Sequence, residues 1–320
     1  MKISDMTVGE PFEGYYLITK AELRQTRAGK DFLSLSFQDE TGTIAGNLWD
    51  ASPEQSEIFV SGVVVYMSGK KELYQGQPQV NHIQLRLAVD NEPNDPADYK
   101  EKPPVAASDL RDYLSQKISA IDNSIWQQVV RTLYQKYDTD FYTYPAAKAN
   151  HHAFETGLAF HTATMVQVAD KLADVYPQLN RGLLFAGIML HDLAKVIELT
   201  GPDNTNYTLR GNLIGHITLI DEEVTKVLLE LGIDDRLEDV LVLRHCLLSH
   251  HGQLDYGSPV RPMIMEAEII HMIDNIDAHM MMMTTALSQV APGERTSQIW
   301  ALEKRSFYKP ECTLEKEEVD

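Results

Sequence analysis

The chain has 320 residues, a formal net charge of −19, 43% hydrophobic residues and 23% charged residues. This length allows two domains, each with its own core, and the acidic balance argues against a protein that coats nucleic acid through general positive charge. Since no stretch reaches the roughly 18 apolar residues of a membrane helix and two cysteines (Cys246 and Cys312) are too few for a disulfide framework, we expect a cytoplasmic protein without a membrane partner.

Residues 1–90 are predicted to form short strands separated by turns. Apolar and polar side chains alternate through five segments, which end at Gly or at polar turn residues. These segments are residues 14–26, 31–42, 43–50, 59–74 and 77–88, and a helix-like stretch at 52–59 interrupts them. This order is typical of a small Greek-key barrel of the oligonucleotide/oligosaccharide-binding (OB) type. Another kind of small β-barrel is the alternative.

The barrel segment also carries the residue types that bind single-stranded nucleic acid, which are aromatic platforms and cationic side chains. The cationic candidates are Arg24, Arg27, Lys30, Lys70 and Lys71, and the aromatic candidates are Phe32, Phe37, Trp49, Tyr66 and Tyr74. Because alternation sends some of these rings inward, we expect Trp49 to face the core. A module that binds protein, or one that mediates oligomer contacts, is the competing interpretation.

A change of composition marks a predicted linker at residues 91–107, which contain four prolines. From Ser108, the expected N-cap, the apolar period becomes helical, with Leu110, Leu114, Ile118 and Ile121 on one face. Further helices are expected at about 157–175, 181–198, 211–231, 234–250 and 262–290. The chain is therefore predicted to continue as an all-α domain at 108–290 and an acidic C-terminal tail at 291–320.

Ten of the eleven histidines lie after residue 150, and several stand in apolar, helix-like segments. The notable set comprises His161, the dipeptide His191–Asp192, His216, His250 and Asp274, spaced by about one helix plus a turn. Antiparallel helices can bring such side chains to one level of a bundle, where facing helices build metal sites. A buried carboxylate is costly unless it is paired, which favours a bound cation. Any single histidine could instead be a hydrogen-bonded core residue.

Imidazole and carboxylate donors together suit Mn, Fe, Co, Ni or Zn, and the set is large enough for two ions. A first ion would take His161, His191, Asp192 and Asp274, and a second would take His216 and His250, with Asp192 as the bridge. Two metals roughly 3.5–4 Å apart clamp the attacking and leaving oxygens of an in-line displacement at phosphorus. Lys195, four residues after His191 on the predicted helix, would steady a phosphate oxygen.

The order H…HD…H…H…D, with HDxxK at 191–195, resembles the HD superfamily of metal-dependent phosphohydrolases over residues 150–290. HHAFETGLAFHT (151–162), LLSHHGQLDYGSPVRPM (247–263) and EAEIIHMIDNIDA (266–278), after an OB-like barrel, resemble the YhaM-type 3′→5′ exoribonucleases. The resemblance implies Mn²⁺ on the ligands His161, His191, Asp192, His216, His250 and Asp274. The donor types and their number also allow Co²⁺, Fe²⁺, Ni²⁺ or Zn²⁺ and favour two ions. The resemblance also implies removal of nucleoside 5′-monophosphates from the 3′ end of single-stranded RNA, or of single-stranded DNA. From the residues themselves we expect Asp192 and Lys195 to be catalytic.

The chain differs at two places from the cyclic-dinucleotide phosphodiesterase branch of the superfamily. Gly157 occupies the position of a glutamate that holds a third metal in some members, and HHGQLDYGSP replaces the HHExxDGxGYP signature. His251 is therefore ambiguous among an extra ligand, a substrate contact and a residue that orients a ligand from behind. His151, His152 and Ser258 are further candidates for contact with metal or substrate.

Two other functions stay open from the sequence. The chain could be a phosphohydrolase of small nucleotides or cyclic dinucleotides, which predicts turnover of small substrates without residues 1–90. It could also be a non-catalytic nucleic-acid-binding protein, which predicts oligonucleotide binding without cleavage. The intact set of ligands argues against this second alternative. Homo-oligomerisation through an apolar helix face is a further open interpretation.

Overall fold

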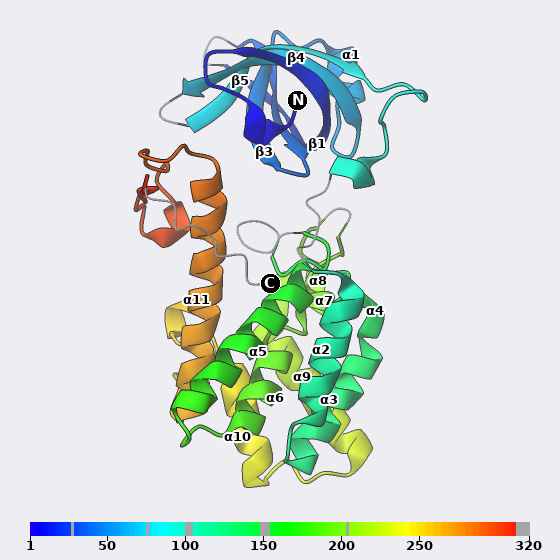
Figure 1. Ribbon diagram of the computed structural model, residues 1–320. Coiled ribbons are helices and arrows are strands. Elements are labelled where there is room, and N and C mark those ends of the chain that lie inside the picture. The colour runs from blue at the N-terminus through cyan, green and yellow to red at the C-terminus, as the bar shows by residue number, and fades with distance from the viewer. Residues whose placement is uncertain (27–28, 75–76, 100–104, 148–153, 203–204, 312–320) are drawn as a thin grey trace. The chain divides into compact units, whose positions relative to one another are not determined.

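The structure, a computed structural model, describes residues 1–26, 29–74, 77–99, 105–147, 154–202 and 205–311. The chain divides into two compact units (Figure 1), a barrel unit of Met1–Lys102 with Thr285–Asp320 and a helical unit of Pro103–Thr284. The division at residue 103 lies inside the predicted linker. Residues 291–320, predicted to be a separate tail, group with the barrel unit.

The barrel unit contains the five strands that the alternation predicts. β1 (Pro11–Gln25), β2 (Asp31–Asp39), β3 (Gly42–Trp49), β4 (Val64–Tyr74) and β5 (Gln77–Leu87) form a closed barrel in the order β1-β2-β3-β5-β4. β1 pairs with β4 along its first half and with β2 along its second half, and β3 pairs in parallel with β5. The predicted helix-like break is α1 (Pro53–Ile58), which Ser52 begins with a capping box. This topology is that of an OB-type barrel, as predicted.

Alternation along the strands explains which side chains fill the barrel. Leu33, Leu35 and Phe37 of β2 are buried, while the residues between them face outward. The register of β2 with β3 pairs Phe32 with Trp49 on the outer face, where Trp49 is 54% exposed. The prediction that Trp49 faces the core is therefore wrong, because its position along the strand, and not the size of the indole, decides its direction.

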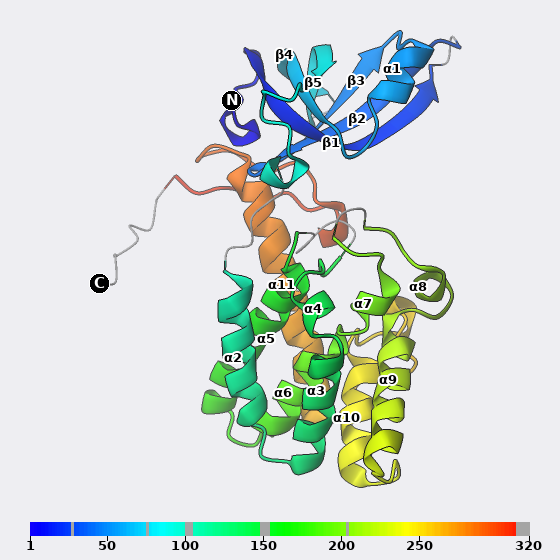
Figure 2. The same ribbon diagram turned by 90° about the vertical axis from the view of Figure 1, so that its right-hand side faces the viewer.

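The helical unit is an all-α bundle, as predicted, in which α2, α3, α9 and α10 lie with their axes roughly aligned (Figure 2). α6 packs against α3, α5 and α10, and every residue of α6 from Gly182 to His191 is buried. The helices are α2 (Ala107–Ser119), α3 (Ser124–Lys136), α4 (Asp138–Phe141), α5 (Gly157–Val175), α6 (Arg181–His191), α7 (Lys195–Glu198), α8 (Leu209–Ile214), α9 (His216–Leu231), α10 (Glu238–Ser249) and α11 (Met265–Ser288).

The first helix of this unit buries the predicted face but starts earlier than predicted. Leu110, Leu114 and Ile118 of α2 are buried, as their spacing indicates. The N-cap is Ala106, and Ser108 lies inside the first turn, where its hydroxyl donates to Asp109 at 3.3 Å. The prediction of Ser108 as N-cap is therefore wrong, because its hydroxyl bonds to a side chain and not to a free backbone N–H.

Two predicted helices are interrupted at the residues that build the candidate site. The segment 181–198 breaks because α6 ends at His191 and α7 begins at Lys195, which leaves Asp192 in the turn. The segment 211–231 breaks at Gly215, whose φ of +77° suits glycine, so His216 opens α9. The expectation of one continuous helix through His191 and Lys195 is thus wrong. The turns direct side chains that are adjacent in sequence toward a shared centre.

The segment after α11 is irregular. Isolated bridges pair Arg295 with Tyr308 and Ile299 with Arg305 around the 3₁₀ turn η4 (Trp300–Leu302). Further short 3₁₀ turns are η1 (Ile3–Asp5), η2 (Pro96–Tyr99) and η3 (Leu254–Tyr256). Within the ranges that the structure describes, no helix combines the length and the apolarity that a membrane crossing requires.

Candidate metal centre

The six predicted metal ligands lie around one centre inside the helical unit. They come from five helices or from the turns next to them: α5, α6, α9, α10 and α11. His161, His191 and His250 have no exposed surface, and Asp192 is 4% exposed. Helices separated in sequence therefore bring polar side chains into the buried interior of the bundle.

Asp192 lies between the histidines and turns one carboxylate oxygen to each side. Its Oδ2 is 3.4 Å from His191 Nε2 and 3.7 Å from His161 Nε2. Its Oδ1 is 3.4 Å from His216 Nε2 and 4.0 Å from His250 Nε2. One carboxylate thus faces two sets of nitrogen donors, which is the arrangement of a bridging ligand.

Two groups of three side chains bring their ligand atoms within 4.8 Å of one another. The first ligand group is His161, His191 and Asp274, and the second ligand group is His216, His250 and His251. In the first group, His161 Nε2 is 3.3 Å from His191 Nε2 and 3.4 Å from Asp274 Oδ1. His251, which the sequence left ambiguous, thus joins the second group.

The donor atoms fit a pair of divalent ions. Asp192 Oδ1, His216 Nε2 and His250 Nε2 are buried and have no hydrogen-bond partner among the described residues. Leaving each such atom buried without a partner lowers the stability of the fold by about 1–3 kcal/mol. A bound cation would remove this penalty for all three atoms. Mixed imidazole and carboxylate donors suit Mn, Fe, Co, Ni or Zn better than Ca or Mg.

The Nδ1 atoms of the five histidines are anchored, which turns each Nε2 toward the centre. His191, His250 and His251 donate from Nδ1 to the backbone carbonyls of Ile188, Leu247 and Tyr256, each at 2.7 Å. His161 Nδ1 donates to Asp277 Oδ2 at 2.6 Å, and His216 Nδ1 donates to Glu198 Oε1 at 3.0 Å. These bonds select the tautomer whose Nε2 lone pair can bind a metal.

The sequence reasoning did not identify Asp277 and Glu198. Both are buried acidic residues, at 8% exposure each. A signal for them was present, because Asp277 follows Asp274 by one helical turn and Glu198 ends the apolar run that contains Asp192. The criterion that selected Asp192, an acidic residue within an apolar segment, would have selected both.

The charges around the centre shift the ionisation of its members. Burial by itself lowers the pKa of the His161 imidazole, but hydrogen bonds with Asp274 and Asp277 outweigh burial and raise it to about 10. Burial also opposes ionisation of Asp192, yet Lys195 and His191 hold its pKa well below the usual range. Burial lowers the pKa of His250 and of His251, which favours their neutral, metal-binding form.

Lys195 reaches the centre although it does not continue the helix of His191. Its Nζ lies 2.6 Å from Asp192 Oδ2, and its side chain is 13% exposed. Burial disfavours the ammonium, but Asp192 outweighs burial and raises the pKa of Lys195. A permanent positive charge therefore stands beside the bridging carboxylate.

The remaining candidates of the helical unit are partly described. Ser258 is 2% exposed, and its Oγ has no hydrogen-bond partner among the described residues. It belongs to the turn after Tyr256, whose carbonyl anchors His251. His151 and His152 lie outside the described residues.

On the barrel, three of the candidate residues form one row on the outer face. The register places Arg24 beside Phe32, and Phe32 beside Trp49, with 4.9 Å between the two ring centroids. Arg24 Nε donates to Glu22 at 3.0 Å, and Lys30 Nζ donates to Asp50 at 3.1 Å. A cation and two aromatic rings thus share a surface, and both cations are balanced by carboxylates.

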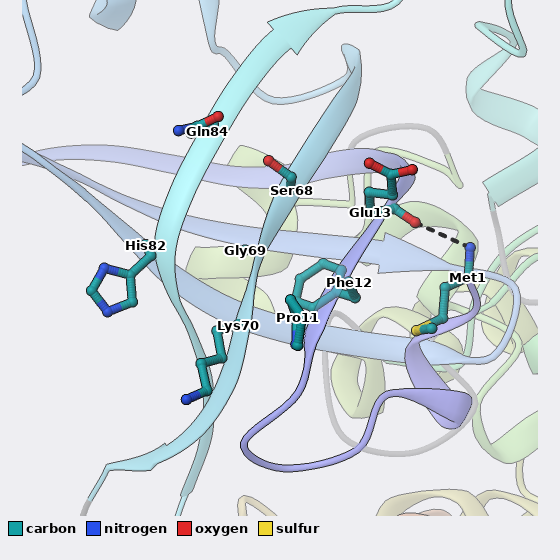
Figure 3. Close-up of a pocket in the computed structure, with 9 residues that line it drawn as sticks. All are labelled: Met1, Pro11, Phe12, Glu13, Ser68, Gly69, Lys70, His82 and Gln84. Atoms are coloured by element: carbon teal, nitrogen blue, oxygen red, sulfur yellow. Dashed lines mark hydrogen bonds between the residues drawn. The ribbon is translucent and has the colours of Figure 1, made fainter.

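The other barrel candidates lie elsewhere. Lys70 lines a hollow of about 630 Å³ between β1, β4 and β5, where Figure 3 shows it with His82 across from Glu13. Tyr74 is 59% exposed at the end of β4. Lys71, predicted as a nucleic-acid-binding cation, donates from Nζ to the Met6 carbonyl at 2.9 Å. Phe37 is buried, and Arg27 lies outside the described residues.

The residues matched by a protein-family model lie within the helical unit. The HD domain family model matches residues 158–279, which include all six predicted ligands. The helical unit contains an HD domain. HD domains bind divalent metals and indicate a metal-dependent hydrolase of the phosphohydrolase type.

Among solved structures, this chain is similar to the second OB-fold domain of replication protein A from Methanococcus maripaludis, determined by solution NMR. The two are 22% identical over 28% of this chain and 96% of that chain, with a TM-score of 0.21. The OB assignment of the barrel follows from its own strand order and closure.

Proposed function

We propose that this protein is a cytoplasmic, metal-dependent 3′→5′ exonuclease that hydrolyses the terminal phosphodiester of single-stranded RNA and releases nucleoside 5′-monophosphates. Single-stranded DNA is the second polymer it would accept. The observation that carries the proposal is the position of Asp192, whose two oxygens face two separate groups of donors. The two groups would hold two divalent ions, and a pair of such ions would suit displacement at phosphorus.

The chemistry divides between the ions and the chain. Bound ions polarise phosphate oxygens and lower the pKa of a water, and Mn²⁺ is the ion we expect. Asp192 presents one carboxylate oxygen to each ligand group. The anchored histidines keep their Nε2 atoms fixed before substrate arrives. Lys195 supplies a positive charge that stabilises the charge developing on the phosphate in the transition state.

The barrel supports a polymeric substrate. Phe32 and Trp49 offer stacking surfaces for bases, and stacking is worth about 1–3 kcal/mol per base. Arg24 lies next to Phe32 in the sheet, where it can exchange its pairing with Glu22 for a phosphate. A protein that acts on free nucleotides has no need of such a surface. The resemblance of the HD-domain motifs to YhaM-type exoribonucleases supports the same substrate.

The decisive experiment is a time course on 5′-labelled single-stranded RNA with Mn²⁺, with and without EDTA. A ladder that shortens from the 3′ end and disappears on chelation is the expected result. Intact RNA together with hydrolysis of mononucleotides or cyclic dinucleotides would replace the proposal with a small-nucleotide phosphohydrolase. Intact RNA that is nevertheless bound tightly, with no hydrolysis of any substrate, would indicate a binding protein.

A further inference from the structure

The Nδ1 partners of the histidines at the centre are of two kinds. His191, His250 and His251 donate to backbone carbonyls, whereas His161 and His216 donate to carboxylates. His161 belongs to the first ligand group and His216 to the second. Among the described residues, each group therefore has one histidine that is backed by a full negative charge.

Asp277 fixes the ring of His161 together with Asp274. Asp277 Oδ2 lies 2.6 Å from Nδ1, and Asp274 Oδ1 lies 3.4 Å from Nε2 on the opposite edge of the ring. The two carboxylates are one turn apart on α11 and face the same side of that helix. α11 thus presents both a donor of the first ligand group and the residue that orients its neighbour.

Glu198 fixes His216 through both the side chain and the backbone. Its Oε1 accepts from His216 Nδ1 at 3.0 Å and from the His216 backbone N–H at 3.1 Å. Glu198 is itself held, because its carbonyl accepts from the Thr208 N–H at 2.8 Å. Gly211 allows this approach, since a Cβ there would overlap the Glu198 carbonyl.

We propose that Asp277 and Glu198 are positioning residues that orient one histidine each and strengthen its Nε2 as a metal donor, Asp277 for the first ligand group and Glu198 for the second. This inference rests on the metal centre of the proposed function. A carboxylate that accepts Nδ1–H fixes the tautomer and makes the other ring nitrogen more basic. A backbone carbonyl carries only a partial charge, so it strengthens the imidazole less.

The test is a calorimetric titration of the full, metal-free chain with Mn²⁺ and no substrate. Asp277→Asn and Glu198→Gln keep the size and an acceptor oxygen but remove the charge. Each variant is expected to weaken binding about 10–100-fold at one ligand group and to leave the other unchanged. The double variant should weaken both.

Two matched controls separate this effect from the loss of any buried carboxylate. Asp170 on α5 is paired with Lys117 and Arg181, and Glu223 on α9 is paired with Lys136. Asp170→Asn removes a paired carboxylate from the helix of His161, and Glu223→Gln removes one from the helix of His216. Both controls should lower the melting temperature and leave both Mn²⁺ affinities unchanged.

A variant that lacks a histidine of the second ligand group tests which ion Asp277 and Glu198 each affect. In His250→Ala, one Mn²⁺ should remain bound, and its affinity should fall with Asp277→Asn but not with Glu198→Gln. If His250→Ala does not fold, His251→Ala provides the same background through a ligand at the edge of the group. The proposal would be contradicted if, in this background, Glu198→Gln lowered the Mn²⁺ affinity and Asp277→Asn did not, or if both lowered it equally.

Wild-type Mn²⁺ affinity in both charge variants, or losses that the controls reproduce, would overturn the inference. Asp277→Ala, which removes the acceptor altogether, must weaken binding at least as much as Asp277→Asn. Because the titration contains no RNA, its outcome is independent of the substrate. If the Mn²⁺ affinities change as expected but RNA stays intact, the inference about Asp277 and Glu198 stands and only the proposed exonuclease activity is rejected.

Discussion

The metal centre and the outer face of the barrel are the two regions proposed to bind substrate, and they are built in opposite ways. In the centre, most of the polar groups are buried, and each anchored histidine has a fixed Nδ1 partner. On the barrel, Arg24 and Lys30 are exposed and pair with neighbouring carboxylates. Exposed pairs contribute about 0–1 kcal/mol, so they can exchange for a phosphate at little cost.

Buried polar groups reveal more about the ligand of a site than exposed ones do. A buried polar group must be satisfied, so the three donor atoms of the centre that have no partner among the described residues indicate a cation without any knowledge of the substrate. An exposed aromatic ring beside an arginine is compatible with many partners. The centre is therefore defined by its own chemistry, whereas the barrel face needs an experiment to define it.

The largest expected effect comes from removing the residue that joins the two ligand groups. Asp192→Ala should abolish retention of both ions and lower the rate on RNA by on the order of 10²–10³-fold or more. Metal content by mass spectrometry and the labelled-RNA time course measure the two losses. Asp170→Asn is the control, since it also loses a paired, partly buried carboxylate. Normal turnover by Asp192→Ala would sink the mechanism.

A backbone contact should affect one half of the centre only. In Gly211→Ala, the new methyl group overlaps the Glu198 carbonyl, so the backbone of Glu198 must shift, and its carboxylate, which accepts from His216, shifts with it. We expect roughly 10-fold weaker binding of one Mn²⁺ and a lower melting temperature. Asn212→Ala, at the exposed neighbouring position, is the control and should change neither quantity. Equal weakening of both ions in Gly211→Ala would argue against two separable groups.

The barrel face should contribute to the capture of long substrates and not to the chemical step. Loss of base stacking in the double variant Phe32→Ala/Trp49→Ala should raise KM for a long oligonucleotide roughly 5–150-fold per stacked base. The value of kcat, and turnover of a dinucleotide, should stay unchanged. Tyr176→Ala, an exposed ring of the helical unit, is the control. An unchanged KM would assign the barrel to protein contacts or to oligomer formation.

The smallest expected effect concerns a buried charge with no role in binding. Burial alone raises the pKa of Glu223, but hydrogen bonds from Lys136, Lys226 and Tyr137 outweigh burial and lower it to about 2. Because the folded-state pKa is lowered, this stabilisation is present above pH 4.5, the ordinary value for Glu, and is lost as the pH falls toward 2. The stability difference between the wild type and Glu223→Gln should shrink over that range in thermal unfolding. A difference independent of pH would contradict this account.

Much of the fold could be predicted from local pattern. Alternation predicted all five strands, and the apolar period predicted the main helices, because both periods record which face of an element is buried. Trp49 was assigned to the wrong face although Ile44 and Leu48 of the same strand already set the direction. The helix breaks at Asp192 and Gly215 were missed because an apolar run continues through both.

The amino-acid sequence alone indicated that polar residues enter an apolar bundle, because buried histidines and acids must be satisfied. The order of its motifs predicted six of them as one set of ligands. The tertiary structure decided that Asp192 faces two groups, that Asp277 and Glu198 stand behind His161 and His216, and that Lys71 turns to a backbone carbonyl. These facts depend on contacts between elements far apart in the chain. Local periodicity records burial, but only packing decides which buried atoms touch.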